Sequence, residues 1–288
     1  MIYQHPLAYL LGLEGVALMR AFDGEYGREF TQARISEIRA LLEAADEIGD
    51  GVETPPITTV DGYRAWSAYY DEPNTLIDFE EPVTRSFLKD LPTGRALDAA
   101  CGTGRYAAYL ISLGHDVIGV DSSPEMLAVA KAKVPGADFR AGDLHQLPVP
   151  DDDVDLVVCA LALTHIPELG PVLAEFVRVL RPGGHVVIAD SRNDWPVVQP
   201  LPGGRFGHFP HRNHRTSDYL AAALPLGLQV RRCEEPLLPA QIVDPAATPP
   251  AEVEHPSDIW SLQRWCPAAA NAASGSKPGA IIWVFQLT

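Results

Sequence analysis

The chain has 288 residues, and its 47% hydrophobic and 21% charged content is ordinary for a globular protein with a full buried core. Its formal net charge of −16 excludes a long nucleic-acid partner, since phosphate backbones are bound through cationic side chains. The four cysteines form no C-x-x-C pair, which argues against a zinc site and favours free thiols in a reducing cytoplasm. No apolar run approaches membrane-spanning length. We therefore expect a cytoplasmic protein without nucleic acid, membrane or metal among its partners.

The first third of the chain, residues 1–92, is predicted to be a helical cap. Residues 7–19 are apolar along nearly their whole length, and residues 35–42 repeat apolar side chains at helical spacing. The 7–19 helix is either the face of a homodimer or a helix buried within the cap. A further helix is predicted at residues 75–91. Between these helices lies a helical piece with four aromatic side chains, Tyr63, Trp66, Tyr69 and Tyr70.

From residue 93 to residue 288 the pattern changes to short apolar runs that alternate with helical segments, which we interpret as one domain. The first five strands are predicted at residues 96–98, 117–120, 137–140, 154–159 and 185–190. Such alternation is typical of an α/β fold with a doubly wound parallel sheet. Two more strands are predicted at 228–235 and 281–287, separated by an insertion at about 239–279 that is proline-rich at first and then helical.

The end of the first strand carries the residues that constrain function most. Residues 96–104 read Ala-Leu-Asp-Ala-Ala-Cys-Gly-Thr-Gly, an apolar run that reaches an acid at Asp98 and is followed by two glycines. This is the pattern of a parallel strand, a tight turn and a helix N-terminus, where glycine lets a ligand approach the backbone. Asp121 ends the next strand, where an acid binds the ribose hydroxyls of a cofactor. Dinucleotide enzymes and S-adenosylmethionine enzymes share this spacing.

Three features separate these two classes. Asp98 precedes the glycines, where it can hold an ammonium group; a Gly-Asp-Leu run at 142–144 can flank an adenine; and a Leu-Arg-Pro-Gly-Gly run at 180–184 precedes the fifth strand. With these motifs, residues 97–190 resemble the class I S-adenosylmethionine-dependent methyltransferases, within them the small-molecule branch of quinone-biosynthesis and natural-product enzymes. The resemblance implies a Rossmann-like sheet of seven strands with an antiparallel last strand. It also implies methyl transfer to a small organic acceptor, for which we expect oxygen as the target atom, with carbon and nitrogen left open.

The resemblance further implies which residues bind the cofactor, S-adenosyl-L-methionine. The methionine end would lie near Asp98, the ribose near Asp121 and Ser122, and the adenine beside Asp143 and Leu144. Two tyrosines would close over the cofactor. At the position of Ala100 the family usually has glycine. The complete set is Tyr63, Tyr70, Asp98, Ala100, Gly102, Asp121, Ser122, Asp143, Leu144 and Ala160.

Histidines and arginines provide the candidates for catalysis and acceptor binding. His165 follows the fourth strand and faces the cofactor crevice, so it is our candidate for a substrate contact or general base; the alternative is a structural histidine that positions its loop. A basic stretch after the fifth strand predicts a site for a carboxylate or phosphate on the acceptor, through His208, His211, Arg212 and Arg215. The alternative is a solvated loop, and a metal site is disfavoured because no rigid element fixes the histidines.

Two other function classes stay open on the sequence alone. A nicotinamide-dependent oxidoreductase can use the same glycine turn, although Asp98 and the 142–144 run speak against it. A scaffold or enzyme that binds S-adenosylmethionine without transferring its methyl group is the other. The methyl-transfer step has no obligatory catalytic side chain, so no single residue excludes this alternative.

Overall fold

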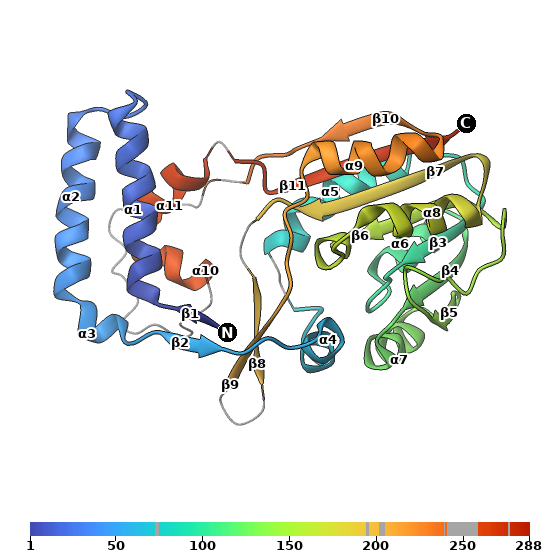
Figure 1. The fold of residues 1–288 in the computed structure, drawn as a ribbon, viewed down its shortest axis with the longest axis horizontal. Coiled ribbons are helices and arrows are strands. Elements are labelled where there is room, and N and C mark those ends of the chain that lie inside the picture. The colour runs from blue at the N-terminus through green and yellow to red at the C-terminus, as the bar shows by residue number, and fades with distance from the viewer. Residues whose placement is uncertain (73–74, 194–195, 202–204, 239, 241–258, 276) are drawn as a thin grey trace. The chain divides into compact units, whose positions relative to one another are not determined.

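The computed structural model describes the chain in two compact units (Figure 1). Residues 73–74, 194–195, 202–204, 239, 241–258 and 276 lie outside the described part of residues 1–288. Unit 1 comprises Met1–Pro56, Val198–His208 and Leu237–Lys277, and unit 2 comprises Ile57–Val197, Phe209–Pro236 and Pro278–Thr288. Each unit is described by itself.

Unit 2 is built on a seven-stranded sheet with the order β10-β11-β7-β6-β3-β4-β5. Its strands are β3 (Arg95–Ala99), β4 (Asp116–Asp121), β5 (Asp138–Ala141), β6 (Val154–Ala160), β7 (Leu180–Ser191), β10 (Leu228–Glu234) and β11 (Ala280–Leu287). Strands β3 to β7 pair in parallel, whereas β11 is antiparallel to both of its neighbours, β7 and β10. The predicted fold class is confirmed: a doubly wound, Rossmann-like α/β sheet of seven strands with an antiparallel last strand.

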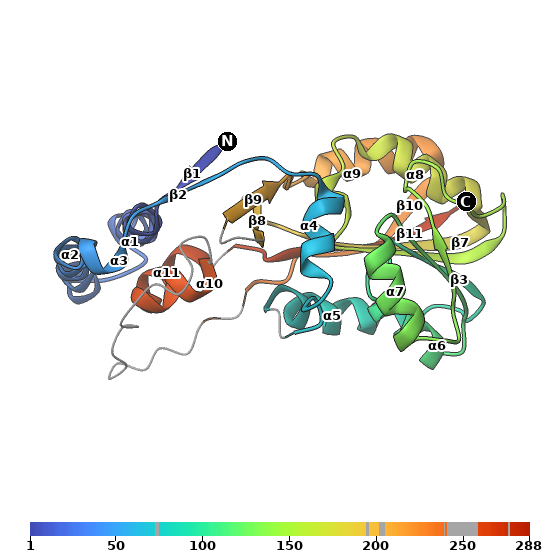
Figure 2. The same cartoon turned by 90° about the horizontal axis from the view of Figure 1, so that it is seen from below.

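Helices cover both faces of this sheet (Figure 2). One layer contains α5 (Thr75–Leu88), α6 (Arg105–Ser112) and α7 (Pro124–Lys133), and the other contains α8 (Leu169–Val179) and α9 (Thr216–Ala223). Because side chains alternate along a strand, Ala96 packs in the cluster that includes α6, whereas Leu97 packs in the cluster that includes α8. The central strands are therefore apolar on both faces, which is why they are readable as continuous apolar runs.

Two shorter elements of unit 2 lead into the site described below. Helix α4 (Thr59–Trp66) begins after Thr58, whose hydroxyl oxygen accepts a hydrogen bond from the backbone N–H of Asp61. The 3-10 turn η1 (Leu163–His165) follows β6, and a second such turn, η2 (Leu224–Leu226), follows α9. None of the helices in the described part of the chain is long and apolar enough to cross a membrane.

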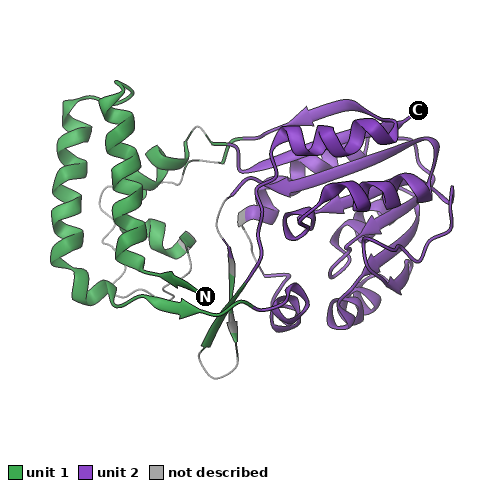
Figure 3. Cartoon of the chain, in the orientation of Figure 1, with its two compact units in different colours: residues 1–56, 198–208, 237–277 green, residues 57–197, 209–236, 278–288 purple. Residues whose placement is uncertain are grey.

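Unit 1 is a helical assembly with short strands (Figure 3). Its elements are β1 (Ile2–Gln4), α1 (Pro6–Phe22), α2 (Arg28–Glu43), α3 (Ala45–Ile48), β2 (Val52–Thr54), α10 (Ile259–Leu262), η3 (Gln263–Trp265) and α11 (Pro267–Ser274). Strands β8 (Val197–Leu201) and β9 (Arg205–Phe209) pair in a separate small sheet. Helix α1 buries Leu10 and Leu13 in the core of the unit and exposes Met19 and Phe22, so one face of the apolar helix is covered and another is not.

The two units divide the chain differently from the predicted boundary between residues 92 and 93. The unit that contains the sheet begins at Ile57, and α5 belongs to it because Phe87 and Leu88 pack in the same cluster as the sheet residue Ala96. Most of the insertion predicted at about 239–279 belongs to unit 1, which includes Leu237–Lys277, because α11 packs its alanines against α1. The first part of that insertion lies outside the described residues. The role of residues 1–92 as a cap stays a prediction.

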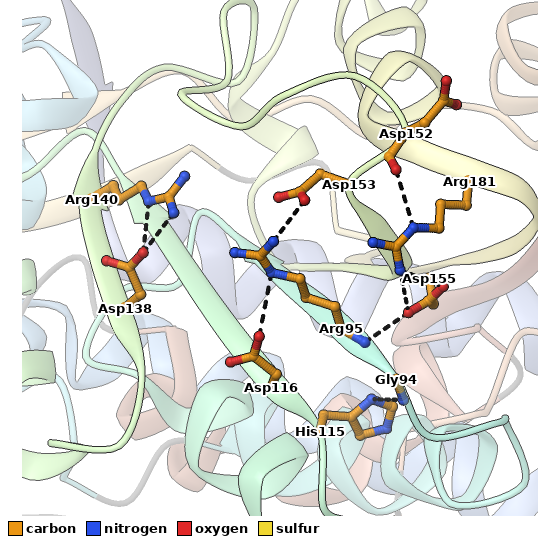
Figure 4. Close-up of polar contacts among 10 residues, drawn as sticks. All are labelled: Gly94, Arg95, His115, Asp116, Asp138, Arg140, Asp152, Asp153, Asp155 and Arg181. Atoms are coloured by element: carbon orange, nitrogen blue, oxygen red, sulfur yellow. Dashed lines mark hydrogen bonds and ion pairs between the residues drawn. The ribbon is translucent and has the colours of Figure 1, made fainter.

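The strand starts of unit 2 carry a network of charged side chains at the opposite edge from the strand ends (Figure 4). Asp155 of β6 accepts a hydrogen bond from the backbone N–H of Arg95 in β3 (2.8 Å) and pairs with Arg181 of β7 (2.9 Å). Arg95 pairs in turn with Asp153 (2.6 Å). These contacts join the starts of three neighbouring strands, and we assign them a structural role.

Candidate active site

The turn between β3 and α6 has the backbone geometry of a loop that binds a ligand. Ala100, Gly102 and Gly104 have positive φ angles of 58°, 52° and 85°, a region that glycine enters at little cost. At Gly104 a Cβ would lie 3.3 Å from the ring of Phe139, so this glycine lets the helix start pack closely. At Gly102 the nearest atom to a Cβ would be the Tyr70 ring at 3.9 Å, so the backbone there is accessible.

Ala100 is strained because its φ of +58° is unfavourable for a residue with a Cβ. We expect Ala100→Gly to increase the free energy of unfolding by about 1 kcal/mol, since the relief of strain exceeds the added entropy of the unfolded chain. Urea unfolding measures the change. Ala99→Gly is the matched control in the buried strand β3, and it should decrease the same free energy by about 1 kcal/mol. An Ala100→Gly variant that is less stable than the wild type would contradict the inference that Ala100 is strained.

Asp121, at the end of β4, joins the glycine turn to the start of α7. Its Oδ2 accepts a hydrogen bond from the backbone N–H of Gly102 (2.8 Å), and its Oδ1 accepts one from the N–H of Ser123 (2.8 Å). Burial raises the pKa of Asp121, whereas the N–H groups of Ser123 and Gly102 act in the opposite direction. The carboxylate thus fixes two loops and also lines the cavity described next.

A cavity of about 240 Å³ lies in unit 2 at the carboxyl ends of β3, β4 and β6. This is the edge of a doubly wound sheet at which ligands bind. With one exception, Asp98, the cavity is lined by every predicted cofactor residue and by the candidate base: Tyr63, Tyr70, Ala100, Gly102, Asp121, Ser122, Asp143, Leu144, Ala160 and His165. The structure therefore brings together residues that lie up to 102 positions apart, as in the pair of Tyr63 and His165.

The sequence alone did not indicate the other residues that line the cavity. They are Thr59, Val60, Val120, Ser123, Met126, Leu161, Ala162 and Ile166; Gly142, which also lines the cavity, belongs to the predicted 142–144 run. Ser123 and Met126 could have been found, because they begin the helix that follows Asp121. Thr59 and Val60 carried no signal, because their position depends on how α4 packs against the sheet.

Asp98 lies beneath the glycine turn, where it joins β3 to α6. Its side chain is buried, and its Oδ2 accepts a hydrogen bond from the backbone N–H of Ala107 (2.8 Å). Burial raises the pKa of Asp98 to about 7, whereas the Ala107 N–H and the charge of Arg105 act in the opposite direction. A direct contact between Asp98 and the methionine end of a cofactor stays a prediction.

Two ion pairs with α7 hold α4 and the segment after it, which carries Tyr70 near the glycine turn. Asp71 pairs with Lys133 (2.6 Å), and Arg64 pairs with Glu125 (3.0 Å). All four side chains are more than a third exposed, so each pair contributes little to stability. The ring of Tyr70 also contacts the rings of Tyr63 and Trp66, so these exposed pairs only add to its aromatic packing.

The loop after β6 enters the cavity wall through a strained backbone. Leu161 has a φ of +56°, and its N–H donates to the carbonyl oxygen of Ala189 in the neighbouring strand (2.7 Å). Strain of this kind in a residue other than glycine is characteristic of functional sites. The sharp bend ends β6 after Ala160 and brings Ala162 and His165 into the wall of the cavity.

His165 has one ring nitrogen fixed by the backbone and the other directed at a tyrosine. Its Nδ1 lies 2.7 Å from the carbonyl oxygen of Pro210, and its Nε2 lies 2.9 Å from the hydroxyl oxygen of Tyr63. A carbonyl oxygen can only accept, so Nδ1 carries the hydrogen and Nε2 accepts one from Tyr63. Burial lowers the pKa of His165, although the hydrogen bond to Pro210 acts in the opposite direction, so we infer a neutral imidazole at pH 7.

The basic stretch after β7 supports the backbone around His165. The Nε2 of His214 lies 3.0 Å from the carbonyl oxygen of Leu163 and 2.9 Å from that of Ile166, and a protonated Nε2 donates to both. The Nε2 of His211 lies 3.1 Å from the carbonyl oxygen of Asn193. Two of the histidines thus satisfy backbone acceptors, which is a structural use of their ring nitrogens.

None of the four residues predicted to bind the acceptor lines the cavity. His208 belongs to unit 1, where its Nδ1 lies 2.9 Å from the carbonyl oxygen of Thr54. Arg212 and Arg215 are exposed. An anion site formed by this stretch stays a prediction. Within the described part of the chain, no group of three His, Cys, Asp or Glu residues could hold a metal ion.

Comparison with known proteins places this site in a family context. Residues 97–188 match the family model described as a methyltransferase domain. A demethylmenaquinone methyltransferase of Renibacterium salmoninarum is 36% identical over 137 residues, which cover 47% of this chain and 52% of that protein. A malonyl-[acyl-carrier protein] O-methyltransferase of Yersinia pestis is 39% identical over 93 residues, which cover 32% of this chain and 35% of the relative. The chain therefore matches about half or less of the length of these two relatives.

Solved structures show the same fold at lower identity. The structure of a DhpI–SAH complex is similar with a TM-score of 0.55 and 21% identity, over 78% of this chain and 93% of that chain. The sequence match from residue 97 to residue 188 runs from β3 into β7, so it includes the glycine turn, Asp121 and the loop of His165. Residues 97–188 therefore match a methyltransferase domain, and the two relatives named above are methyltransferases.

Proposed function

We propose that this protein transfers a methyl group from S-adenosylmethionine to a small organic acceptor. One observation carries the proposal: the cavity at the strand ends gathers the glycine turn, Asp121 and the loop at Asp143 around a single space. The open side of Gly102 fits a ligand that lies against the backbone. When bound, the cofactor supplies a methyl group on a positively charged sulfur, which is already activated for transfer.

We further propose how the cavity holds this cofactor. The carboxylate of Asp121 accepts hydrogen bonds from the ribose hydroxyls, and Leu144 provides an apolar surface for the adenine. Tyr70 lies near Gly102 and covers the methionine end. A closed, aromatic surface of this kind excludes water from the reacting atoms, which favours methyl transfer over side reactions. Asp98 supports this arrangement by holding the turn from below.

Oxygen is our proposed target atom. A hydroxyl nucleophile keeps a proton of high pKa and needs a base, whereas an amine free of its proton does not. His165 lines the cavity as a neutral imidazole whose acceptor nitrogen faces the hydroxyl of Tyr63, which also lines the cavity, so it can serve as that base through the tyrosine. Among the relatives, the malonyl-[acyl-carrier protein] O-methyltransferase supports oxygen, and the demethylmenaquinone methyltransferase supports a quinone-like acceptor.

The two other function classes make different predictions. A nicotinamide-dependent oxidoreductase is disfavoured because the segment with the glycine turn matches a methyltransferase domain. A protein that binds S-adenosylmethionine without transferring its methyl group would have the same cavity. The sequence also predicts an anionic acceptor and a homodimer; matched charged and uncharged probes test the first, and light scattering tests the second.

Calorimetry and product analysis test the proposal. We expect the purified chain to bind S-adenosylmethionine and S-adenosylhomocysteine with dissociation constants on the order of 10 µM, and not to bind NAD. Incubation with a panel of phenols, quinols and hydroxy acids should give an acceptor that gains one methylene by mass spectrometry. Binding of NAD alone would support the oxidoreductase, and cofactor binding without any methylated product would support the scaffold.

A further inference from the structure

Tyr63 donates a hydrogen bond to His165, which donates one to the backbone. The use of this pair in catalysis rests on the proposed function. Tyr63 comes from α4 and His165 from η1. The Tyr63 hydroxyl donates to Nε2 of His165 (2.9 Å), and Nδ1 of His165 donates to the carbonyl oxygen of Pro210 (2.7 Å). Since the only hydroxyl hydrogen of Tyr63 points at His165, the hydroxyl oxygen can offer the cavity nothing but lone pairs.

The hydrogen bonds of Tyr63 and His165 favour an acceptor that donates a hydrogen bond to the Tyr63 oxygen. Burial raises the pKa of Tyr63, and the nearby Tyr70, Asp121 and Asp190 act in the same direction, so the hydroxyl stays neutral. A neutral oxygen with free lone pairs can bind a hydroxyl group of the acceptor. It cannot bind a carboxylate or a phosphate, because these groups only accept when they are ionised.

The side chains around Tyr63 and His165 favour an uncharged, flat acceptor. Tyr63 stacks on Trp66 at 5.8 Å, and Phe209 lies 5.4 Å from the Tyr63 ring and 5.2 Å from the His165 ring. Among the described residues that line the cavity there is no lysine or arginine, whereas Asp121 and Asp143 are present. Apart from the sulfonium of a bound cofactor, an anion would therefore meet carboxylates without a cation from the protein, while an aromatic ring would meet the rings of Tyr63, Tyr70 and His165.

We propose that Tyr63 receives the hydroxyl hydrogen of the acceptor, that His165 is the base behind it, and that the acceptor is an uncharged phenol-like compound. As the acceptor oxygen bonds to the methyl carbon, the bond between sulfur and methyl breaks and the sulfur keeps its electron pair. The acceptor proton moves to the oxygen of Tyr63 while the Tyr63 proton moves to Nε2 of His165. Tyr63 ends neutral, and the imidazolium releases its proton to water.

Nuclear magnetic resonance of the full-length protein tests the direction of these hydrogen bonds, and it needs no known acceptor. The ¹⁵N shifts of His165 at pH 7.5 should show the tautomer with hydrogen on Nδ1, and the Nε2 signal should move in Tyr63→Phe. Tyr69→Phe is the matched control, because Tyr69 is a neighbouring tyrosine outside the cavity lining, and it should leave that signal in place. Hydrogen on Nε2, or an unchanged Nε2 signal in Tyr63→Phe, overturns the proposal.

Calorimetry with a matched pair of probes tests the acceptor class. With S-adenosylhomocysteine saturating, methyl 3,4-dihydroxybenzoate should bind at least about tenfold more tightly than 3,4-dihydroxybenzoate, which carries a carboxylate. Tyr63→Phe should weaken binding of the ester about tenfold, the effect of one lost hydrogen bond in a closed site. Equal or tighter binding of the acid, an ester that is insensitive to Tyr63→Phe, or binding of neither probe overturns the acceptor class.

The pH profile of methyl transfer tests the role of His165 as a base. In the wild type, kcat should rise with pH through a pKa below the ordinary histidine value, because the buried imidazole must be neutral to accept a proton. Besides Tyr63, His211 lies near His165, with its ring centre 6.2 Å away, and the carboxylate of Asp190 accepts from the backbone N–H of the preceding residue, Thr164. His165→Gln should lower kcat about a hundredfold or more and remove that rise.

A His165→Gln variant that keeps the rise of kcat with pH would overturn the role of this histidine. Failure of the proposed function is a separate outcome, because it appears as wild-type protein that does not bind S-adenosylmethionine. Failure of this inference leaves binding of S-adenosylmethionine intact.

Discussion

Asp121→Ala should weaken binding of S-adenosylmethionine about a hundredfold or more. The carboxylate is proposed to accept hydrogen bonds from the ribose hydroxyls, and bonds to a charged group are worth about 1.5–3 kcal/mol each. The same side chain holds the backbone N–H groups of Gly102 and Ser123, both at 2.8 Å, so its removal also loosens the loops that form the cavity. Isothermal titration calorimetry measures the change in affinity.

Asp116→Ala is the matched control for this variant. Asp116 begins the strand that Asp121 ends, and its side chain is 77% exposed at the opposite edge of the sheet. The control should leave the affinity for S-adenosylmethionine unchanged. An Asp121→Ala variant that binds as tightly as the wild type would show that the cofactor does not lie on this carboxylate.

Glu80→Ala should decrease the free energy of unfolding by about 3–5 kcal/mol. Glu80 of α5 is fully buried, and its carboxylate accepts hydrogen bonds from Arg105 (2.6 Å), Tyr106 (2.7 Å) and Thr84 (2.9 Å). Its removal leaves the guanidinium of Arg105, which is only 17% exposed, without its closest anion. The hydroxyl of Tyr106 loses its acceptor as well, and each such loss in a buried site has a cost. Urea unfolding of both proteins gives the difference.

The neighbouring residue separates this effect from a general loss of charge on α5. Glu81 is partly exposed and pairs with Arg85 (2.7 Å), and it lies farther from Arg105 (3.4 Å) than Glu80 does, so Glu81→Ala should cost only about 1 kcal/mol. Similar unfolding midpoints for the two variants would contradict a central role of Glu80. The position matters for function because Arg105 begins α6, directly after the glycine turn.

The sheet and most of the cavity were predictable from the sequence because both depend on local patterns. A parallel strand that is covered on both faces is a continuous apolar run, and the residues at its carboxyl end lie at the ligand edge by topology. Asp121, Asp143 and Ala160 each follow such a run, and all three line the cavity. The glycine turn is equally local, since it is formed by consecutive residues whose φ angles require glycine or strain an alanine.

The partners of His165 were not predictable, because they come from distant parts of the chain. Tyr63 is 102 positions away and Pro210 is 45 positions away, and neither spacing follows a period. The charges of the stretch after β7 indicated an anion site, whereas His214 and His211 lie within hydrogen-bonding distance of backbone carbonyl oxygens. The carbonyl oxygens of the irregular turn η1 need donors from outside it, and sequence composition does not show which side chains supply them.

The division into units depends on long-range packing in the same way. Helix α11 follows an insertion late in the chain, yet its alanines pack with Leu10 and Ala17 of α1. Its sequence predicts a helix but carries no information about which distant helix it contacts. Asp98 is a smaller case: the acid at the strand end was recognised, but the inward direction of its side chain depends on the N–H of Ala107 in the following helix.

A crystal structure with S-adenosylhomocysteine bound tests the central claim most directly. We expect the ribose hydroxyls within hydrogen-bonding distance of Asp121, the adenine beside Asp143 and Leu144, and the sulfur on the side of Tyr63. Product bound elsewhere on the chain, or in this cavity with its ribose away from Asp121, would contradict the claim.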